Sequence, residues 1–579
     1  MNAVTKLLTD HMDVWTAAYT EKRSGRGRSA TGSAYGIKKL RELILELAVR
    51  GKLVPQDPRD EPARDLLLRI GSQGKHDRKS SDLRVQAELD EQLFDIPSTW
   101  AWVNLPKVSS YKVGKTPSTK SNIYWTEHVD GINWVSIADL SDDGEVRETA
   151  KRVSCEAARD VFRNPPSPVG TILMSFKLTL GKISYLKIPA YHNEAIISIF
   201  PTSAIFDRYL FKVLPSRAKA GDTKSAIKGN TLNSESIAAL KIPIPPLAEQ
   251  HRIVAKVDEL MALCDQLEAA QAGAAEAHEN LVTQLLGTLT ASKNAEDFAA
   301  SWQRIATHFD TLFSTEVSID ALKQTILQLA VMGKLVPQDP NDEPSNELLK
   351  RIEFRKSRLI EDGIIKKDKT LRLIAEKEKP FPIPSTWVFT RLQTVLDVRD
   401  GTHDSPKEAS GPDTYPLVTS KDFEDGMINF DTAKMISAAD HFEISKRSFV
   451  EKFDILFSMI GGNIGNQVMV DDDRQFSVKN VALFKYYDRD VTVPKYIKKY
   501  TENLARTLQK SAIGGAQPFI GLGSLRDLVF ALPPVNEQHR IVAKVDELMT
   551  LCDQLRAHLS QANRVQQTLA DTLVIQAVA

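Results

Sequence analysis

Apolar residues in two distant segments recur at alternating intervals of four and three residues. This is the spacing of a coiled-coil seam rather than of a broad amphipathic face. Each segment follows a Pro-Pro pair and carries a Glu near its start, where a carboxylate suits the helix dipole. The expected seam residues are Ile253, Val257, Leu260, Cys264 and Leu267 in the first segment and Ile541, Val545, Leu548, Cys552 and Leu555 in the second. We expect the first helix to reach about Leu286, and packing of each seam within its own domain is the alternative to pairing between the two helices.

Two shorter helices are predicted by apolar stripes, and short apolar runs between the helices predict strands. The stripes are Leu40, Ile44 and Leu47, and then Leu322, Ile326 and Leu329. Gly51 and Gly333 follow these stripes and are expected to end the helices ahead of Pro-rich loops. The runs at 171–176 and 454–459 are bounded by Gly or polar residues, as strands are. The predicted class is α+β, with two mixed α/β modules separated by long helices.

An internal duplication organises the chain. LAVRGKLVPQDPRDEP from Leu47 returns from Leu329 as LAVMGKLVPQDPNDEP, and IPSTW at 96–100 returns at 383–387. EQHRIVAKVDELM at 249–261 returns unchanged at 537–549. The segments enclosed by these blocks are similar in length but share little identity. Two equivalent scaffolds with different contents indicate a protein that recognises two different targets in one geometry.

The repeats divide the chain into seven parts. They are an N-terminal extension (1–35), a first repeat with its helix and loop (36–100), the first insert (101–245), the first conserved helix (246–290), a linker with the second copy of the repeat (291–387), the second insert (388–533) and the second conserved helix (534–579).

Composition and charge change this picture little. The first insert has 19 Lys and Arg against 13 Asp and Glu, a net charge of +6, whereas the second has 18 against 20, a net charge of −2. Bulk charge is therefore weak evidence for a nucleic-acid partner. The three cysteines are far apart, which excludes a disulfide framework or a CxxC zinc site and suits a reducing cytoplasm. No apolar run approaches the roughly 20 residues that span a bilayer, and the polar N-terminal stretch predicts no secretion signal, so we expect no membrane partner and a cytoplasmic location.

No segment of the sequence matches a known catalytic motif in full. Asn164-Pro-Pro-Ser167 resembles an adenine-methyltransferase loop but lacks the aromatic residue that stacks on a flipped base. The glycines between Gly461 and Gly465 lack the Lys-Ser/Thr ending of a phosphate loop, so a tight turn is expected there. His251 and His539 occupy equivalent repeat positions, for which a solvated or capping role is the simpler interpretation. We expect neither a catalytic nor a metal site, and the alternative is a methyltransferase or nuclease with a divergent active site.

Candidate DNA contacts lie on loops at matching places in the two inserts. In the first insert Lys112, Lys115 and Lys120 can neutralise phosphates, and Thr116 and Ser118 can donate to phosphates or base edges. The candidates at the matching place in the second insert are Asp400, Thr402, His403, Asp404, Ser405 and Lys407. Later polar loops and turns add Lys177, Lys228, Asn230, Lys421, Asn463 and Gln517. Asp suits cytosine and Asn or Gln suits adenine, while a solvated loop or ordinary turn is the alternative for each residue taken alone.

These motifs together resemble the specificity subunit of type I restriction-modification enzymes. They are the duplicated Pro-Pro-x-x-Glu-Gln followed by HRIVAKVDEL, the heptapeptide DGTHDSP at 400–406 and DILFS at 454–458. The resemblance covers nearly the whole chain, and the long N-terminal segment and GKLVPQ repeats are similar to the subgroup with longer chains. The Gly-Lys-Thr-Pro match at 114–117 in the first insert is looser than its counterpart in the second.

The resemblance implies a noncatalytic subunit of a larger assembly. Each insert would be a target recognition domain for one half of a bipartite double-stranded DNA site. The repeat helices would form an antiparallel coiled coil with pseudo-twofold symmetry that sets the half-site spacing and docks two methylation subunits. Those subunits would use S-adenosylmethionine to methylate adenine, and ATP- and Mg-dependent restriction subunits would join for cleavage. The chain itself would bind no cofactor.

Overall fold

The computed structural model describes residues 10–19, 34–73, 93–177, 179–203, 205–220, 224–226, 229–231, 234–368, 370–512 and 518–578. The chain divides into two compact units, each containing one insert. Unit 1 holds the described residues up to 273 and those from 563 onward, and unit 2 holds the described residues 274–562.

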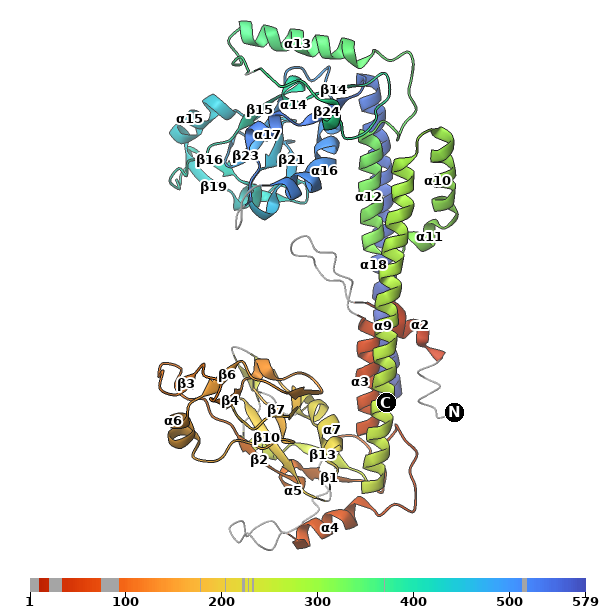
Figure 1. The fold of residues 1–579 in the computed structure, drawn as a ribbon, viewed down its shortest axis with the longest axis vertical. Coiled ribbons are helices and arrows are strands. Elements are labelled where there is room, and N and C mark those ends of the chain that lie inside the picture. The colour runs from red at the N-terminus through yellow and green to blue at the C-terminus, as the bar shows by residue number, and fades with distance from the viewer. Residues whose placement is uncertain are drawn as a thin grey trace. The chain divides into compact units, whose positions relative to one another are not determined.

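In unit 1 the strands of the first insert lie beside the long helices (Figure 1). Its helical elements are α2 (Met12–Ala17), α3 (Tyr35–Val49), α4 (Ala63–Gln73), α5 (Leu105–Val108), η1 (Ile137–Asp139), α6 (Cys155–Ala157), η2 (Ala158–Phe162), α7 (Asp207–Ala220), α8 (Ser234–Ala238) and the first part of α9 (Leu247–Ala291). Its strands are β1 (Ala101–Asn104), β2 (Ser109–Val113), β3 (Trp125–Thr126), β4 (Ile132–Val135), β5 (Gly144–Val146), β6 (Lys151–Val153), β7 (Ile172–Ser175), β8 (Ile183–Leu186), β9 (Ala190–His192), β10 (Ile196–Pro201), β11 (Lys224–Ala226), β12 (Gly229–Thr231) and β13 (Lys241–Ile244).

In unit 2 the second insert is placed in the same way. Its helical elements are the rest of α9, then α10 (Ala295–Thr307), α11 (Phe309–Leu312), α12 (Glu316–Val331), α13 (Ser345–Glu361), η3 (Glu376–Glu378), α14 (Leu392–Val395), η4 (Ser420–Asp422), η5 (Phe430–Thr432), α15 (Ala438–Ser448), η6 (Gly461–Asn463), α16 (Pro494–Ser511), α17 (Leu522–Arg526) and most of α18 (Val535–Val578). Its strands are β14 (Val388–Arg391), β15 (Leu396–Asp400), β16 (Thr414–Val418), β17 (Phe423–Glu424), β18 (Met427–Ile428), β19 (Lys434–Ser437), β20 (Ile455–Ser458), β21 (Gln467–Met469), β22 (Ser477–Val478), β23 (Val481–Tyr486) and β24 (Val529–Leu532).

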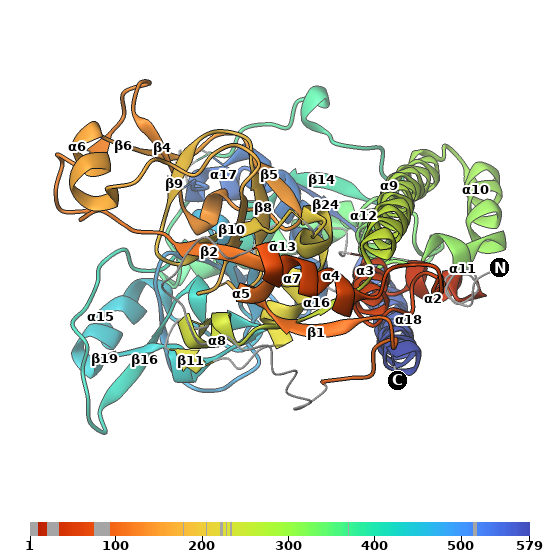
Figure 2. The same ribbon diagram turned by 90° about the horizontal axis from the view of Figure 1, so that it is seen from below.

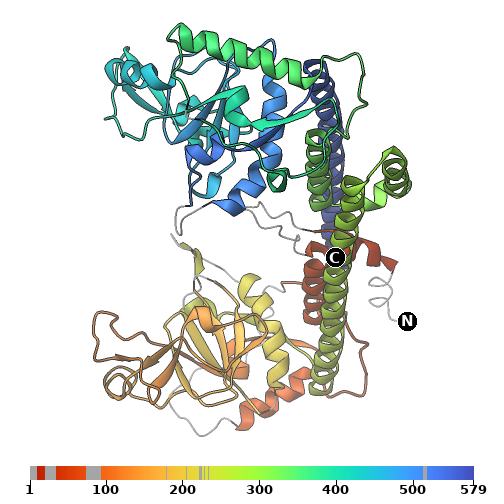
Figure 3. The same cartoon turned by 45° about the horizontal axis from the view of Figure 1, so that its top comes forward.

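The two inserts have the same sheet topology although they share little sequence identity. The first insert contains the strand order β2-β10-β7-β8 with β5 added, and the second contains β15-β23-β20-β21. A smaller sheet in each pairs one strand parallel and one antiparallel to a central strand, in the order β6-β4-β9 in the first insert and β19-β16-β22 in the second. β7 and β20 confirm the strands predicted from the apolar runs at 171–176 and 454–459. Figure 3 shows each sheet beside the helices of its own unit.

The repeated sequence blocks meet at what we call the scaffold junction, formed in unit 1 by Gln56, Trp100 and Glu249. The Glu249 carboxylate accepts hydrogen bonds from Trp100 Nε1 at 3.0 Å and from Gln56 Nε2 at 2.6 Å. In unit 2 the carboxylate of Glu537 accepts the same two bonds at 2.9 and 2.6 Å. A buried carboxylate must have hydrogen-bond partners. This requirement explains why the three sequence motifs that contain Gln56, Trp100 and Glu249 recur together in the second half of the chain.

The next residue of each repeat joins the insert to its helix. Gln250 accepts from the backbone N–H of Phe206 at 2.9 Å and donates to the Pro245 carbonyl at 3.0 Å. Gln538 makes the equivalent bonds to Val493 and Pro533, at 3.0 and 2.9 Å. The Glu-Gln pair of each repeat therefore holds an insert on its scaffold and is fully buried.

In unit 1, α3 packs between parts of the two long helices. Arg41 pairs with Asp265 at 2.7 Å, while Gln56, beyond the end of α3, contacts Glu249, so α3 and α9 run in opposite directions. Tyr35 Oη donates to Asp571 of α18 at 2.8 Å. The buried core of this bundle contains seam residues of α9, stripe residues of α3 and Ala570 of α18. The helix α9 reaches Ala291, beyond the expected end near Leu286.

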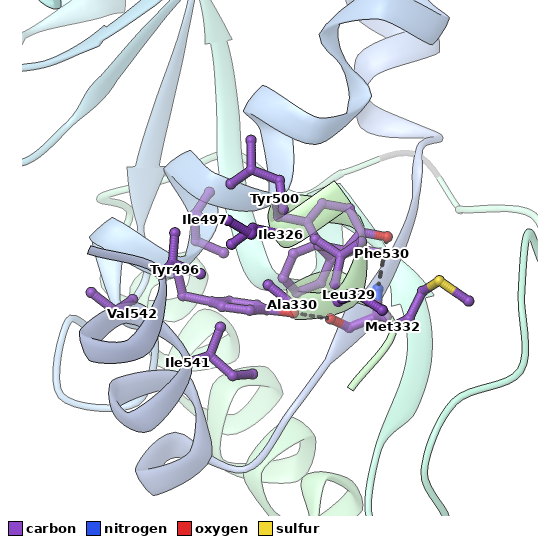
Figure 4. Packing of buried hydrophobic residues seen from close by; sticks show 14 of the residues in the cluster. Ile326, Leu329, Ala330, Met332, Tyr496, Ile497, Tyr500, Phe530, Ile541 and Val542 are labelled. Atoms are coloured by element: carbon purple, nitrogen blue, oxygen red, sulfur yellow. Dashed lines mark hydrogen bonds between the residues drawn. The ribbon is translucent and has the colours of Figure 1, made fainter. Parts of the chain in front are cut away.

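In unit 2 the seam residues of α18 pack against the second insert and α12. Figure 4 shows Ile541 beside Tyr496 of α16 and near Ile326 and Leu329 of α12, and all four belong to one buried cluster. The cluster also includes Val282, Leu286 and Leu289 from the end of α9. α10 returns alongside that end of α9 (Figure 2). At the described seam positions, Ile253, Val257, Leu260, Cys264, Ile541, Val545 and Cys552 are buried, and Leu267, Leu548 and Leu555 are partly buried.

Among the described residues no helix combines the length and apolar character needed to cross a membrane. Nor does this part of the chain contain a group of three or more His, Cys, Asp or Glu side chains suited to holding a metal ion.

Candidate nucleic-acid interface

Three loops meet at one end of the larger sheet in each insert. In the first insert Val113, which ends β2, pairs with Ile197 near the start of β10. Ile196 of β10 in turn pairs with Ser175, which ends β7. Because neighbouring strands are antiparallel, the loops after β2 and β7 and the turn before β10 gather at this end. The strand-end site of the first insert comprises residues 114–120, 176–177 and 193–195.

The loop after β2 is held against the turn before β10. Gly114 N–H donates to the Ile196 carbonyl at 3.1 Å, and Lys115 N–H donates to the His192 carbonyl at 2.9 Å. A Cβ at Gly114 would overlap the His192 carbonyl oxygen, so this close crossing requires glycine. The Thr116 hydroxyl then hydrogen-bonds to the Glu194 carboxylate.

The second insert repeats this crossing with a turn that is one residue shorter. Gly401 N–H donates to the Val481 carbonyl at 3.0 Å, and Thr402 N–H donates to the Val478 carbonyl at 2.9 Å. His403, at the place of Thr116, has its Nδ1 3.0 Å from Oδ1 of Asn480. The strand-end site of the second insert comprises residues 401–407, 459–463 and 479–480. Its loop therefore has the same backbone anchors as the first and different side chains.

The turns after β7 and β20 complete the two sites. Phe176 N–H donates to the Ala195 carbonyl at 2.9 Å, which places Lys177 beside the turn before β10. In the second insert Gly461 N–H donates to the Pro518 carbonyl at 2.8 Å, and Asn463 lies exposed in this turn. Lys421 follows β16, whose last residue Val418 accepts from Lys479 N–H at 2.9 Å, so η4 also adjoins this site.

Basic side chains gather around residues 401–407, although the insert as a whole is slightly acidic. Arg447 donates to the Gly401 carbonyl at 2.6 Å and Lys434 donates to the Pro406 carbonyl at 2.7 Å. Lys479 contacts the hydroxyl of Ser405. These groups bring positive charge to a loop where the sequence predicts DNA contacts, which the net charge of the insert could not reveal.

Contacts with two neighbouring side chains shift the pKa of His403. Its Nε2 lies 2.9 Å from Asp400 Oδ2. The hydrogen bond with Asn480 and the negative charge of Asp400 raise the pKa of His403 above its ordinary value. The imidazole remains largely exposed, with 62% of its side-chain surface accessible.

The first site is anchored mainly through its backbone. Trp134 Nε1 donates to the Lys115 carbonyl at 3.0 Å, and Lys115 Nζ donates to the Val161 carbonyl at 3.0 Å. Trp125 Nε1 donates to the Ser118 carbonyl at 3.1 Å. The side chains of Ser118 and Lys120 stay exposed on the loop, as groups that contact a large ligand must be.

Comparison with known proteins identifies the family. Residues 97–276 and 384–562 match the model of the type I restriction modification DNA specificity domain, so each match contains one insert and the start of the helix after it. The chain belongs to this family. It is a DNA specificity subunit of a type I restriction-modification system.

Two curated relatives match along their full length. The specificity subunit of the Escherichia coli type I restriction enzyme EcoAI is 36% identical over 100% of both chains. That of the Escherichia coli enzyme EcoEI is 34% identical over 99% of both chains. A solved structure, described by its part in the assembly and conformational transition of a type I system, covers 84% of this chain and 99% of its own at 16% identity, with a TM-score of 0.46.

The structure of this specificity subunit brings together most of the residues singled out in the sequence. The strand-end sites contain Lys115, Thr116, Ser118, Lys120 and Lys177 in the first insert, and Thr402, His403, Asp404, Ser405, Lys407 and Asn463 in the second. Lys112 and Asp400 lie on the strands that lead into them, β2 and β15. Lys228 and Gln517 lie outside the described residues, and Asn230 belongs to β12 with its side chain outside the description.

Sequence reasoning missed the turn that precedes β10 and β23. Glu194 and Asn480 are the partners of Thr116 and His403 across this turn. A signal was present: in each insert a polar pair containing Asn comes just before a long apolar strand. Asn480 adopts φ of 56°, a left-handed conformation that Asn tolerates better than most residues. Arg447 and Lys434 were also missed, because only folding brings α15 and β19 to the loop.

Proposed function

We propose that each insert is a target recognition domain that reads one half of a bipartite double-stranded DNA site through its strand-end site. The observation that carries this proposal is that the loops after β2 and β15 share two backbone anchors, while the side chains around those anchors differ. A common frame sets the same approach to DNA, and the differing side chains select different bases.

Within each site we assign two kinds of contact. The exposed lysines Lys120 and Lys407 neutralise phosphates, which positions the protein without selecting a sequence. Ser118, Asp404 and Asn463 are exposed polar groups that can read base edges. Thr402 is buried and serves the loop instead, since its Oγ1 accepts from Asp404 N–H at 3.1 Å.

We also propose that α9 and α18 form an antiparallel coiled coil that sets the spacing of the half-sites and docks two methylation subunits. Each seam packs within its own unit, so support comes instead from the presence of both helices in the buried core of each unit. Docking is supported by Leu263 and Leu551, which occupy equivalent repeat positions and are 44% and 53% exposed. An apolar side chain exposed at the same place in both repeats fits two copies of one partner.

In this proposal the chemistry belongs to other subunits. Methylation subunits would use S-adenosylmethionine to modify adenine, and restriction subunits would use ATP and Mg. The alternative, a divergent active site in this chain, predicts methyl transfer or cleavage by the purified chain alone. An assay with S-adenosylmethionine and DNA separates the two, because the recognition model predicts no turnover without partners.

The deciding experiment is methylome sequencing of a host without other such systems that expresses this chain with its cognate methylation subunit. We expect adenine methylation at one split motif, and exchange of one insert should change only one half of it. A continuous motif, or unchanged halves after insert exchange, would overturn the two-reader proposal.

Single substitutions test the assigned contacts once the motif is known. Lys407→Ala should weaken binding to all sequences alike and lower the slope of log affinity against log salt by about 1. Asp404→Ala should relax selectivity at one position of one half-site. Lys350→Ala, an exposed lysine on α13 paired with Glu347, is the matched control and should change neither quantity.

A further inference from the structure

His403 makes two hydrogen bonds, and both partners are acceptors. Its Nε2 lies 2.9 Å from the Asp400 carboxylate, and its Nδ1 lies 3.0 Å from the side-chain oxygen of Asn480. A neutral imidazole has one donor and one acceptor nitrogen, so it can satisfy only one of these contacts. With the side-chain oxygen of Asn480 facing the ring, both contacts are made only when the ring carries two protons and a positive charge.

The charges around the ring favour this state. Asp400 Oδ1 is buried and has no hydrogen-bond partner among the described residues, so the neighbouring cation compensates its carboxylate. Arg447 of α15 acts in the opposite direction, since its charge lowers the pKa of His403, but by less than Asn480 and Asp400 raise it.

The first insert lacks this arrangement at the matching places. Val113 stands where the second insert has Asp400, and Thr116 bonds to Glu194 where His403 bonds to Asn480. A threonine hydroxyl does not titrate near neutral pH, and burial lowers the pKa of His192 in this crossing to about 4, so the crossing in the first insert has no comparable proton dependence between pH 6 and pH 9.

We propose that protonated His403 is a latch that joins the loop after β15 to the turn before β23 and makes recognition through the second insert, but not the first, dependent on pH. His403 acts as a positioning residue, because both ring nitrogens are occupied within the protein. This inference rests on the proposed role of the strand-end site in DNA binding.

The direction of the effect follows from the raised pKa. The latch is fully formed below the ordinary histidine pKa of about 6.5 and is lost as pH rises through the higher value of the folded protein. Loss of a charge-assisted hydrogen bond and of one positive charge near DNA should weaken binding by about tenfold.

The first test needs no DNA. Nuclear magnetic resonance of the full chain with isotope-labelled histidine follows each ring as pH changes, and His403→Gln identifies its signal by loss. We expect a titration midpoint above the ordinary histidine value of about 6.5, a lower midpoint in Asp400→Asn and a higher midpoint in Asn480→Asp. A midpoint at or below about 6.5, or one unmoved by both variants, would overturn the latch whatever the protein does with DNA.

The second test measures affinity of the assembled methylation complex for its own motif between pH 6 and pH 9. Wild type should weaken by about tenfold across this range, while His403→Gln should bind weakly throughout with little pH dependence. DNA altered only in the half read by the second insert should lose the pH effect, and DNA altered only in the other half should retain it. A pH effect that survives His403→Gln would refute the latch, whereas absence of any split motif would instead refute the proposed function.

Discussion

Glu249 is a residue whose role follows from its hydrogen bonds alone. It is fully buried and accepts from Trp100 and Gln56 at the scaffold junction. Burial raises the pKa of its carboxyl, whereas those two bonds oppose the rise. The role of the buried carboxylate is thus to accept the hydrogen bonds of Trp100 and Gln56.

We therefore expect Glu249→Leu to destabilise the protein by about 2 kcal/mol, since it leaves the buried indole N–H of Trp100 unpaired. Urea unfolding at pH 7 measures the change. Glu259→Ala, on the same helix but exposed and paired only with Lys256, should change stability by less than about 0.5 kcal/mol. Equal effects of the two substitutions would contradict the structural role of the junction.

His192 offers a prediction on the pH dependence of stability. It is buried at the end of β9, and burial lowers its pKa to about 4. Because the unfolded chain binds the proton more tightly, its contribution to stability is present above pH 6.5 and is lost as pH falls toward 4. Between pH 7.5 and pH 5 this loss amounts to about 2 kcal/mol.

His192→Val should remove that part of the acid sensitivity, and valine is chosen because Val478 occupies the equivalent place in the second insert. The measurement is urea unfolding of wild type and variant at both pH values. The same difference between the two pH values in both proteins would show that His192 does not carry the effect.

At the scale of elements, Gly51 and Gly333 end α3 and α12 in matching geometry. Both adopt φ of 68°. A Cβ at Gly333 would lie 2.6 Å from Cγ of Pro384, and the same distance separates a Cβ at Gly51 from Pro97. The glycine thus allows the chain to turn out of the helix against the proline of the IPSTW motif.

Gly333→Ala should cost about 2 kcal/mol, from the left-handed backbone and the overlap with proline. Gly273→Ala is the control, because this glycine lies within α9 and a Cβ added to it would meet open space. This substitution should stabilise the protein by up to about 1 kcal/mol. Thermal unfolding of both variants gives the sign directly. Stabilisation by both would mean that the turn tolerates a side chain.

Element prediction succeeded where local pattern and tertiary packing agree. Three patterns predicted the right element: the 4-3 spacing of α9, the apolar stripe of α3 ahead of Gly51 and the apolar run of β7. In each, the residues that the local geometry places on one face are also the residues that are buried. α2 was not predicted, since a helix of six residues has little periodicity and is held by burial of Trp15.

At the scale of the chain, the last turns of α18 belong to unit 1. Ala570 is fully buried in its core, and Asn563 accepts from Tyr19 N–H at 3.1 Å. The first unit is therefore completed by the end of the chain, which makes its stability depend on residues far away in sequence.

Ala570→Asp should destabilise unit 1 by about 3 kcal/mol, because it places a charge in a core. Hydrogen exchange should speed up in α3 and leave the strands of the second insert unchanged. Thr568→Asp, two residues away and exposed, is the control and should alter neither region. Faster exchange in the second insert alone would contradict the assignment of these turns to unit 1.

The sequence by itself determined the duplication, the long helices, the strands at the centre of each insert and the family, because repeats and periodicity are properties of the chain. It also placed candidate contacts at equivalent loops. Only the tertiary structure decided which groups contact those loops. His403 and Asn480 are 77 residues apart in sequence, and Arg447, which contacts the same loop, belongs to α15. The second proton that we propose on the His403 ring follows from these contacts. Hydrogen bonds between distant residues depend on how strands are ordered in the sheet, and no local pattern records that order.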